Sequence, residues 1–431
     1  MKYIDIIEKY IFQIFIFCLP FQIRYIFASW NPPEPLSILK ISHEFNEWTA
    51  GFIYGSDILF IILIFLWLSR THYTKLQNNH SRQLLVVFSI LLLVVSGLSF
   101  FQADNIYLAT FRYFKLAEGL ILFFYARDFI SRYDYYHIVL PIALSSIFQG
   151  AMATIQSLTQ HSLGLWFLGE GYFYPGLKSV ASFRVGEELF LRAYGTFQHP
   201  NVLAFFGLCN LILIYKYLLI ENSKNKLILG ISIFLIHWTI LLTFSRSIIL
   251  ILMALHGFLF LKYIYAKDGM IKKIILMFMI STIIFSLLYW PQLKSRLHID
   301  VNEEAYQDRV AFSADVTASA IKNKHIGIGI GHGVYDVIKR MPYENAYRYQ
   351  PAHNIFLLIY WELGIIGLLV FTGFIGSLAL ENWRTQLKKM RFLFIFKIVS
   401  MAFVLSLGMV DHYQWTLHQG SMIFWLFLAL V

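Results

Sequence analysis

Apolar runs of about 20 residues recur along the whole chain, and no other feature limits the possible folds as strongly. A helix needs a run of this length to cross a hydrocarbon layer of ~30 Å. The 431-residue sequence is 58% hydrophobic and 14% charged, whereas soluble domains carry about 25% charged residues. The sequence also lacks the ten-residue alternation typical of transmembrane barrels. It therefore predicts an all-α, polytopic membrane protein.

Hydropathy and loop charge together predict a topology. The apolar windows correspond to about twelve helices, centred near residues 18, 61, 92, 115, 148, 209, 236, 256, 281, 366, 401 and 423. The basic loops all fall on one side of the predicted membrane, and the short loops on the other side have no Lys or Arg. Under the positive-inside rule this distribution places both termini in the cytoplasm. The basic loops are residues 69–82, 126–136, 215–226, 261–273 and 381–391, and the short loops without Lys or Arg are 101–105 and 411–420.

The charge and cysteine content exclude other classes of protein. The net charge of +10 arises from these basic loops, so it indicates membrane topology and not nucleic-acid binding. Cys18 and Cys209 both lie within apolar runs, which argues against a disulfide framework. The apolar N-terminal stretch lacks a small-residue cleavage site and is predicted to be a retained first span. Residues 1–431 are therefore expected to form one integral-membrane domain.

Two long segments, residues 159–197 and 291–352, fall on the predicted outer side. The second is long enough for a small periplasmic module within the membrane domain. Residues 302–323 have apolar side chains at helical spacing and predict an amphipathic helix, which the glycines of residues 327–333 then interrupt. Long loops on a membrane scaffold are common places for function.

Three arginines on the outer side are candidate ligands for an anion. Arg246 lies in a tight turn between two apolar helices, where a guanidinium costs ~2.5–3.5 kcal/mol at mid-span unless it faces the bundle interior or a partner. Arg192 precedes a span, and Arg309 lies in the outer module. Converging guanidinium groups suit a diphosphate, because each binds phosphate oxygens in pairs. The structural alternatives are pairing of Arg246 with lipid headgroups or an acid such as Asp57 or Asp411, and an exposed helix charge for Arg309.

The histidines on this side are candidates for catalysis or for helix caps. His353 and Asn354 begin an apolar run, and an imidazole with the ordinary pKa of ~6.5 can accept a proton from a hydroxyl near pH 7. His199 precedes Pro200 at a predicted helix start, where free N–H groups bind anions. A structural cap by His199 or Thr196 explains that pattern equally well. Glu362 lies about 13 Å deeper along the predicted helix than His353 and points from another face of it. We therefore expect Glu362 to pair within the bundle.

Several catalytic signatures are missing from the sequence. "GIGIGHG" (327–333) lacks the Gly-Lys-Ser/Thr ending of a nucleotide-binding loop. There is no Asp-X-Asp, His-Glu-X-X-His or Gly-X-Ser-X-Gly motif. We therefore expect neither a metal centre nor a cofactor.

Four segments in order resemble the O-antigen ligase/polymerase superfamily: "RAYGTFQHPNVLA" (192–204), "TFSRS" (243–247), "GIGIGHG" (327–333) and "AHNIFLLIYWELGIIGLLVF" (352–371). The resemblance implies a glycosyltransferase C-type fold in the bacterial inner membrane. It also implies inverting, metal-independent transfer of glycan from an undecaprenyl-diphosphate carrier on the periplasmic face. The acceptor would be lipid A-core or a growing glycan.

The resemblance also assigns roles to residues. His353 would be the general base, and Arg192 and Arg246, with Arg309 as a third candidate, would hold the carrier diphosphate. His199, Asn354 and His332 are further candidates for substrate binding. The modest outer module disfavours the larger protein O-glycosyltransferases, whereas ligase and polymerase share these motifs. The alternative functions are a transporter or flippase for an anionic or lipid-linked substrate, which Glu118 and Glu362 within spans would suit, and a non-catalytic scaffold.

Overall fold

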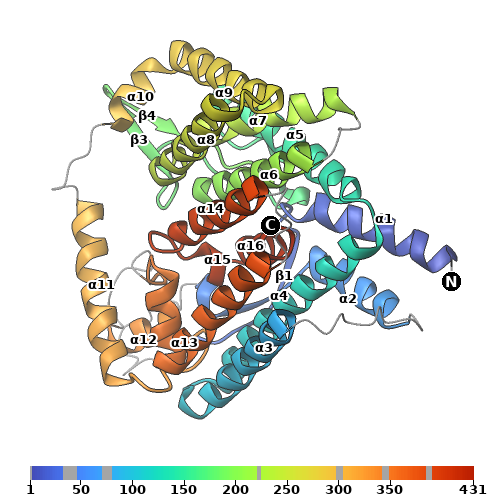
Figure 1. The fold of residues 1–431 in the computed structure, drawn as a ribbon. Helices are drawn as coiled ribbons and strands as arrows, with labels where there is room; N and C mark the ends of the chain where they lie inside the picture. The colour runs from blue at the N-terminus through green and yellow to red at the C-terminus, as the bar shows by residue number, and fades with distance from the viewer. Residues whose placement is uncertain are drawn as a thin grey trace.

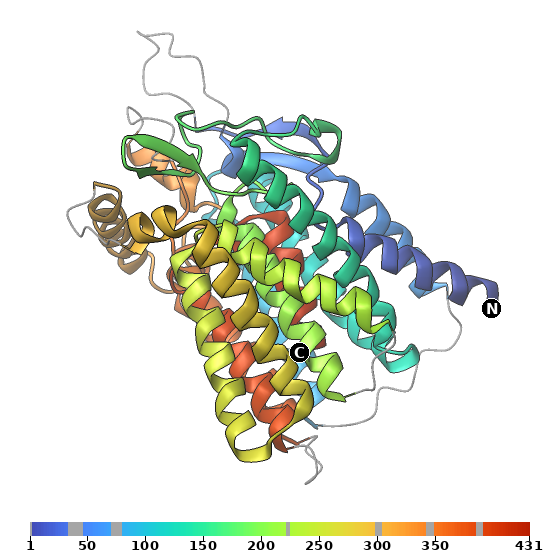
Figure 2. The ribbon, with the colours of Figure 1, turned by 90° about the horizontal axis from the view of Figure 1, so that it is seen from above.

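The protein is a bundle of long helices with two small β-hairpins at one end (Figures 1 and 2). The structure, a computed structural model, describes residues 2–32, 46–69, 80–220, 225–297, 304–341, 349–384 and 391–431. The helices are α1 Lys2–Cys18, α2 Gly55–Leu68, α3 His80–Leu98, α4 Ile106–Arg132, α5 Tyr136–Thr159, α6 Pro200–Ile220, α7 Lys226–Leu242, α8 Arg246–Ala266, α9 Gly269–Leu288, α10 Trp290–Leu297, α11 Glu304–Lys322, α12 Gly333–Arg340, α13 Ile355–Arg384, α14 Arg391–Leu407, α15 Tyr413–Thr416 and α16 His418–Leu430.

The helical, polytopic membrane fold predicted from hydropathy is confirmed. Within the described residues, six helices are long and apolar enough to cross a membrane, namely Arg82–Gln102, Tyr136–Thr159, Pro200–Ile220, Arg246–Ala266, Gly269–Leu288 and Ile355–Trp383. Helices α2, α7 and α16 are apolar but shorter. Each predicted window contains a helix, except that α1 ends at Cys18, so the first predicted centre was placed too late. The count of twelve spans and the C-type fold remain predictions.

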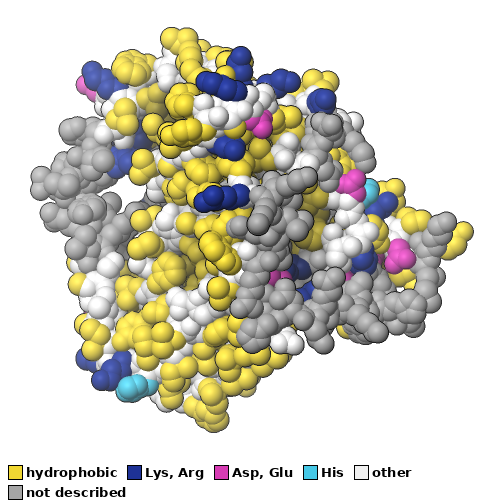
Figure 3. Space-filling model, in the orientation of Figure 1, with side chains coloured by type: hydrophobic (Ala, Val, Ile, Leu, Met, Phe, Trp, Pro, Cys, Tyr) yellow, Lys and Arg dark blue, Asp and Glu magenta, His cyan; other side chains and the backbone are white. Residues whose placement is uncertain are grey.

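The outer surface of the bundle is apolar, as a lipid environment requires. Hydrophobic side chains cover much of the face in Figure 3. Leu250 on α8, Leu287 on α9 and Leu369 on α13 are each more than half exposed. In contrast, α6 is buried along almost its whole length. Exposed leucines on helices of this length are stable in hydrocarbon but costly in water.

Contacts among the described residues join some of the predicted outer loops to one another and some of the predicted inner loops to one another. At one end, the backbone N–H of Asn105 donates to His332, and Asn201 contacts Asp411. At the other end, Arg127 of one basic loop pairs with Glu381 at the start of another at 2.7 Å. The arrangement agrees with the predicted inner and outer sets, while the orientation of the chain in the membrane remains a prediction.

Two antiparallel strand pairs lie at one end of the bundle, at the top of Figure 2. Strands β1 (Arg24–Ser29) and β2 (Ala50–Tyr54) pair with Arg24 opposite Tyr54, and β3 (Ser182–Val185) and β4 (Glu188–Leu191) pair with Ser182 opposite Leu191. The prediction of a purely α-helical chain missed these strands. The β1–β2 segment contributes the short 3₁₀ helix Glu47–Thr49 to the same end.

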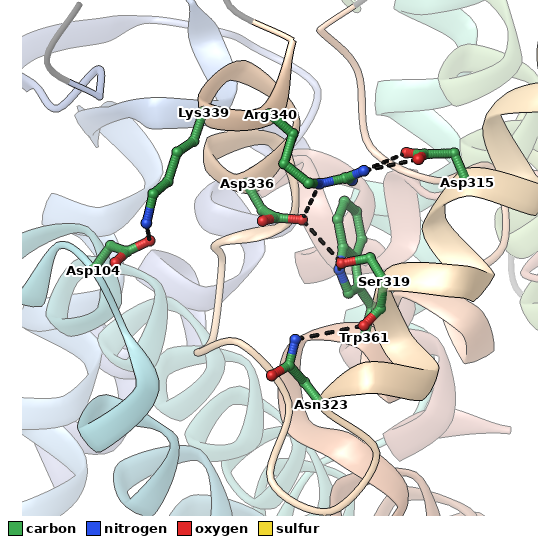
Figure 4. Close-up of polar contacts among 8 residues, drawn as sticks. All are labelled: Asp104, Asp315, Ser319, Asn323, Asp336, Lys339, Arg340 and Trp361. Carbon is green, nitrogen blue, oxygen red and sulfur yellow. Dashed lines mark hydrogen bonds and ion pairs between the residues drawn. The ribbon is translucent and has the colours of Figure 1, made fainter. Parts of the chain in front are cut away.

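The predicted amphipathic helix of the outer module is α11, and the glycine segment separates it from α12. Polar contacts fasten the two helices together (Figure 4). The Arg340 guanidinium on α12 donates to both carboxylate oxygens of Asp315 on α11 at 2.8 Å and to Asp336 at 2.9 Å. Lys339 pairs with Asp104 at 3.0 Å, which ties α12 to the loop before α4. Residues 291–352 remain a predicted module because 298–303 and 342–348 lie outside the described residues.

The glycine segment docks on a break in α13. Gly364 has φ 67° and ψ −172°, a conformation that glycine adopts most readily. The backbone N–H groups of Ile328 and Gly329 donate to the carbonyls of Trp361 and Glu362 at 3.1 and 3.0 Å. A Cβ on Gly364 would lie 2.2 Å from the His325 carbonyl oxygen. The absence of a side chain at Gly364 therefore allows this loop to approach α13 closely.

Candidate active site

His353 lies immediately before α13, at the end of the bundle that holds the outer loops. Its Nδ1 is 3.6 Å from Asp411 Oδ1, and its ring centroid is 5.0 Å from that of His412. The His353 side chain is 21% exposed, so the ring is partly shielded but reachable. Its neighbour Asn354 caps α13, because Asn354 Oδ1 accepts the N–H groups of Phe356 and Leu357 at 2.9 and 3.1 Å.

Asp411 connects His353 to the start of α6. Asn201 Nδ2 donates to Asp411 Oδ2 at 2.9 Å. Burial by itself would raise the pKa of Asp411, but the contact with His353 and the positive potential of His412 hold that pKa well below its usual range. The carboxylate therefore stays ionised, and it can orient the His353 ring and stabilise a positive charge on it.

Arg192 extends the same chain of contacts toward the turn between α7 and α8. Its Nη2 donates to Asn201 Oδ1, and its Nε donates to the Thr243 carbonyl, both at 2.6 Å. Arg192 is almost fully buried. The structure thus links Arg192 to His353 through Asn201 and Asp411, four residues from three distant parts of the chain.

Arg246 and Arg296 lie at the same turn. Arg246 Nε donates to the Arg296 carbonyl at 2.9 Å, and Arg296 Nε donates to the Phe244 carbonyl at 3.2 Å. Arg192 and Arg296 thus both donate to carbonyls of the turn that carries Arg246. Asp57, one acid considered as a partner of Arg246, contacts Lys115 and His418.

The remaining candidate residues have different positions. His199 Nδ1 accepts the N–H of Asn201 at 3.1 Å and so caps α6, and burial together with the charge of Arg192 lowers the pKa of His199 to about 3. His332 has both ring nitrogens engaged: Nε2 accepts from the Asn105 N–H at 3.1 Å and Nδ1 contacts the Ile330 carbonyl at 3.0 Å. Burial lowers the pKa of His332. The backbone of Arg309 belongs to α11, but its side chain lies outside the described residues.

Glu362 pairs within the fold, as its helical position predicts. It is 3% exposed, and its carboxylate accepts from Trp415 Nε1 at 3.2 Å and from the Gly333 N–H at 3.4 Å. Glu362 thus fixes the start of α12 and the α15 segment against α13.

Two groups of side chains have ligand types that suit a divalent cation. One comprises His353, Asp411 and His412, and the other comprises Asp57, Glu118 and His418, with ligand atoms within 4.8 Å of one another in each group. In the second group the Lys115 ammonium already donates to Asp57 and Glu118 at 2.6 and 2.9 Å. Metal independence therefore remains a prediction for this site.

Several residues of the site have no sequence motif of their own that would mark them as functional. Asp411 and His412 lie in a short loop without Lys or Arg, and Asn201 lies within a helix-start motif. Arg296 is one of several charges on α10. Their common feature is position at the outer end of the bundle, which the loop-charge pattern had indicated.

Residues 231–372 match the family model for O-antigen ligase. The resemblance predicted from the four motifs is thereby confirmed. The matched segment includes Arg246, the glycine segment and His353, whereas Arg192 and Asp411 lie outside it. No curated protein matches the chain. The O-antigen ligase match supports glycan transfer of the ligase or polymerase type by a membrane protein.

Proposed function

We propose that this protein is an inverting glycosyltransferase of the bacterial inner membrane. It transfers glycan from an undecaprenyl-diphosphate carrier to a hydroxyl of lipid A-core or of a growing glycan at the periplasmic face. The observation that carries the proposal is the chain of contacts that joins His353 to the arginine turn: His353 Nδ1 lies 3.6 Å from Asp411, Asp411 accepts from Asn201, and Asn201 accepts from Arg192.

His353 is the general base of this proposal. Because its Nδ1 faces Asp411, the Nδ1–H tautomer leaves Nε2 to accept the proton of the acceptor hydroxyl. The acceptor oxygen attacks the anomeric carbon, and the bond from that carbon to the diphosphate oxygen breaks, which inverts the configuration. The Asp411 carboxylate stabilises the imidazolium that forms. The 3.6 Å separation is longer than a hydrogen bond, and catalytic contacts commonly tighten when substrate binds.

The leaving group departs as a diphosphate with the electron pair of the broken bond. Arg192, Arg246 and Arg296 place positive charge around residues 243–246. Their Nε atoms are held by backbone carbonyls, which orients the guanidinium groups before substrate arrives. Such preorganised charge stabilises the negative charge that develops in the transition state. It performs the task that a divalent cation performs in other transferases.

A transporter or flippase is the rival function, and the acids that kept it open have structural partners. Glu118 pairs with Lys115 at 2.9 Å, and Glu362 accepts from Trp415. Compensated charges of this kind fit a fixed packing role as well as a substrate path. The rival therefore gains no specific support from these two residues.

The test is glycan transfer in proteoliposomes that contain a carrier-linked donor and a lipid A-core acceptor, or a second carrier-linked glycan. We expect His353→Ala and Arg246→Ala to fold as the wild type does and to lose transfer. His325→Ala is the matched control, because His325 is an exposed histidine in the same outer module. Full transfer in both His353→Ala and Arg246→Ala would refute the site assignment. Carrier movement across the bilayer without transfer would favour the flippase.

A further inference from the structure

A pocket of mixed aromatic and charged character adjoins the His353 cluster. It is partly open to solvent, and both polar and apolar side chains line it. Segments from α4, α12, α15, α16 and the β1–β2 region form its wall, and the glycine segment covers one side. The side chains that matter most for its chemistry are Trp48, Phe111, Arg112, Lys115, Glu362 and Trp415.

The pocket shares a wall with the site of His353. The Trp48 ring packs edge-on against His412 at 5.2 Å, and Thr416 Oγ1 lies 2.7 Å from His412 Nδ1. Trp48 and Thr416 both line the pocket, as does Pro351, which closely precedes His353. The chain of contacts that begins at Arg192 therefore reaches the pocket through Asp411, His353 and His412. The arginine turn and the pocket lie at opposite ends of this chain.

The cations of the pocket already have acceptors. Arg112 donates to the carbonyls of Trp48 and Thr416 at 2.7 and 3.1 Å. Lys115 donates to two carboxylates, Asp57 and Glu118. The carboxylates of Glu47 and Glu362 also line the pocket. Two cations and two carboxylates thus line the pocket, so a diphosphate would meet both signs of charge here, whereas three arginines gather at the turn.

The same lining matches the chemistry of a sugar ring. Aromatic faces pack against the C–H faces of a pyranose, and carboxylates accept hydrogen bonds from its hydroxyls. The indole N–H of Trp415 already holds the Glu362 carboxylate at 3.2 Å, which fixes one acceptor before a ligand binds. Few polar groups fixed among aromatic walls are typical of sites that orient a small polar ligand.

We propose that this pocket binds the sugar ring of the acceptor and presents its hydroxyl to His353. The carrier diphosphate of the donor then lies on the opposite side of His353, near Arg192. This inference rests on the proposed function and assigns its second substrate to a place in the fold. The acceptor ring belongs either to lipid A-core or to a carrier-linked glycan, and the two arms of the test separate these sources.

Two substitutions alter the pocket in opposite ways. Phe111→Ala removes an aromatic wall on α4, and Ser421→Phe introduces a ring into the space from α16. Phe114→Ala is the matched control, because Phe114 lies one turn further along α4 with 64% of its surface exposed. Each variant is compared with the wild type in thermal stability before kinetics, so that a folding defect is not read as a binding defect.

The measurement is the KM for each substrate in proteoliposomes. One arm offers lipid A-core as acceptor, and the other offers a carrier-linked glycan with a non-cleavable phosphonate in place of its anomeric diphosphate, so that it cannot donate. We expect both pocket variants to raise the acceptor KM about tenfold in one arm, with the donor KM unchanged and Phe114→Ala behaving as the wild type. The arm that responds identifies the source of the ring.

Two results would overturn the assignment of the pocket. An unchanged acceptor KM in both arms would show that the acceptor binds elsewhere. A rise in the donor KM alone would show that the pocket holds donor glycan. Failure of the proposed function itself is distinguishable, because the wild type would then transfer no glycan in either arm.

Discussion

The substitution Asp411→Asn tests the role of the carboxylate beside His353. Asparagine has nearly the same shape, and its side-chain oxygen can still accept the hydrogen bond from Asn201. The change therefore removes the negative charge while it preserves the local packing. We expect kcat to fall because the imidazolium formed during proton transfer loses its stabilising partner.

The size of the loss follows from the 3.6 Å separation between His353 Nδ1 and Asp411 Oδ1. Two unit charges at this distance interact by about 5 kcal/mol at an effective dielectric constant of ~20. The side chains of His353 and Asp411 are 21% and 14% exposed, and we take solvent screening to reduce the interaction to about 2 kcal/mol. A barrier raised by about 2 kcal/mol slows kcat about 30-fold.

The assay is transfer at saturating donor and acceptor, followed by separate titration of each substrate. The control is Asp104→Asn, since the Asp104 side chain is 49% exposed and pairs with Lys339 on the same outer side. We expect the control to keep wild-type kcat. The reasoning is refuted if Asp411→Asn keeps kcat within about threefold of the wild type, or if the effect falls only on the donor KM.

Three further predictions concern metal dependence, acid stability and backbone packing. EDTA should leave transfer unchanged, and a loss that Mg²⁺ or Mn²⁺ restores would instead make Asp411 and His412 candidate ligands with His353. The pKa of His199 is about 3 in the folded protein and ~6.5 when unfolded, so the unfolded state binds more protons between these values and stability falls as pH drops below ~6.5. The loss of unfolding free energy should reach about 2 kcal/mol at pH 5. In detergent, the Tm of His199→Gln should therefore fall less between pH 7.5 and 5 than the Tm of the wild type does. An equal fall in Tm for both proteins would contradict this. Gly327→Ala should lower the stability by about 1–3 kcal/mol, because its Cβ would lie 2.3 Å from the Glu362 carbonyl oxygen at φ +80°, whereas Gly257→Ala on α8, which has open space, should not.

The candidate site was partly predictable because some of its residues lie at the ends of apolar runs. His353 and Arg246 flank predicted spans, and the loop-charge pattern placed both on the outer side. Helical periodicity likewise predicted that Glu362 faces away from His353 and pairs within the fold, which the contact with Trp415 confirms. These inferences need only the local sequence, since each concerns a position on one helix or at its end.

For other residues of the site, the local sequence did not indicate their partners. Asp411 lies 210 positions from Asn201 in the chain, and Arg296 reaches Phe244 from another helix. Trp48 and Glu47 come from the segment between α1 and α2, which the sequence did not mark as part of the site. The sequence likewise did not indicate that Gly364 lies against the backbone of His325.

The sequence by itself determined that this chain is a helical membrane protein, because the hydropathy of each segment is a local property of its residues. The tertiary structure decided which carboxylate faces His353, which arginines share a turn, and where an aromatic pocket opens beside them. Those relations depend on the packing of helices far apart in the chain, and packing is set by side-chain shape across interfaces that no single segment encodes.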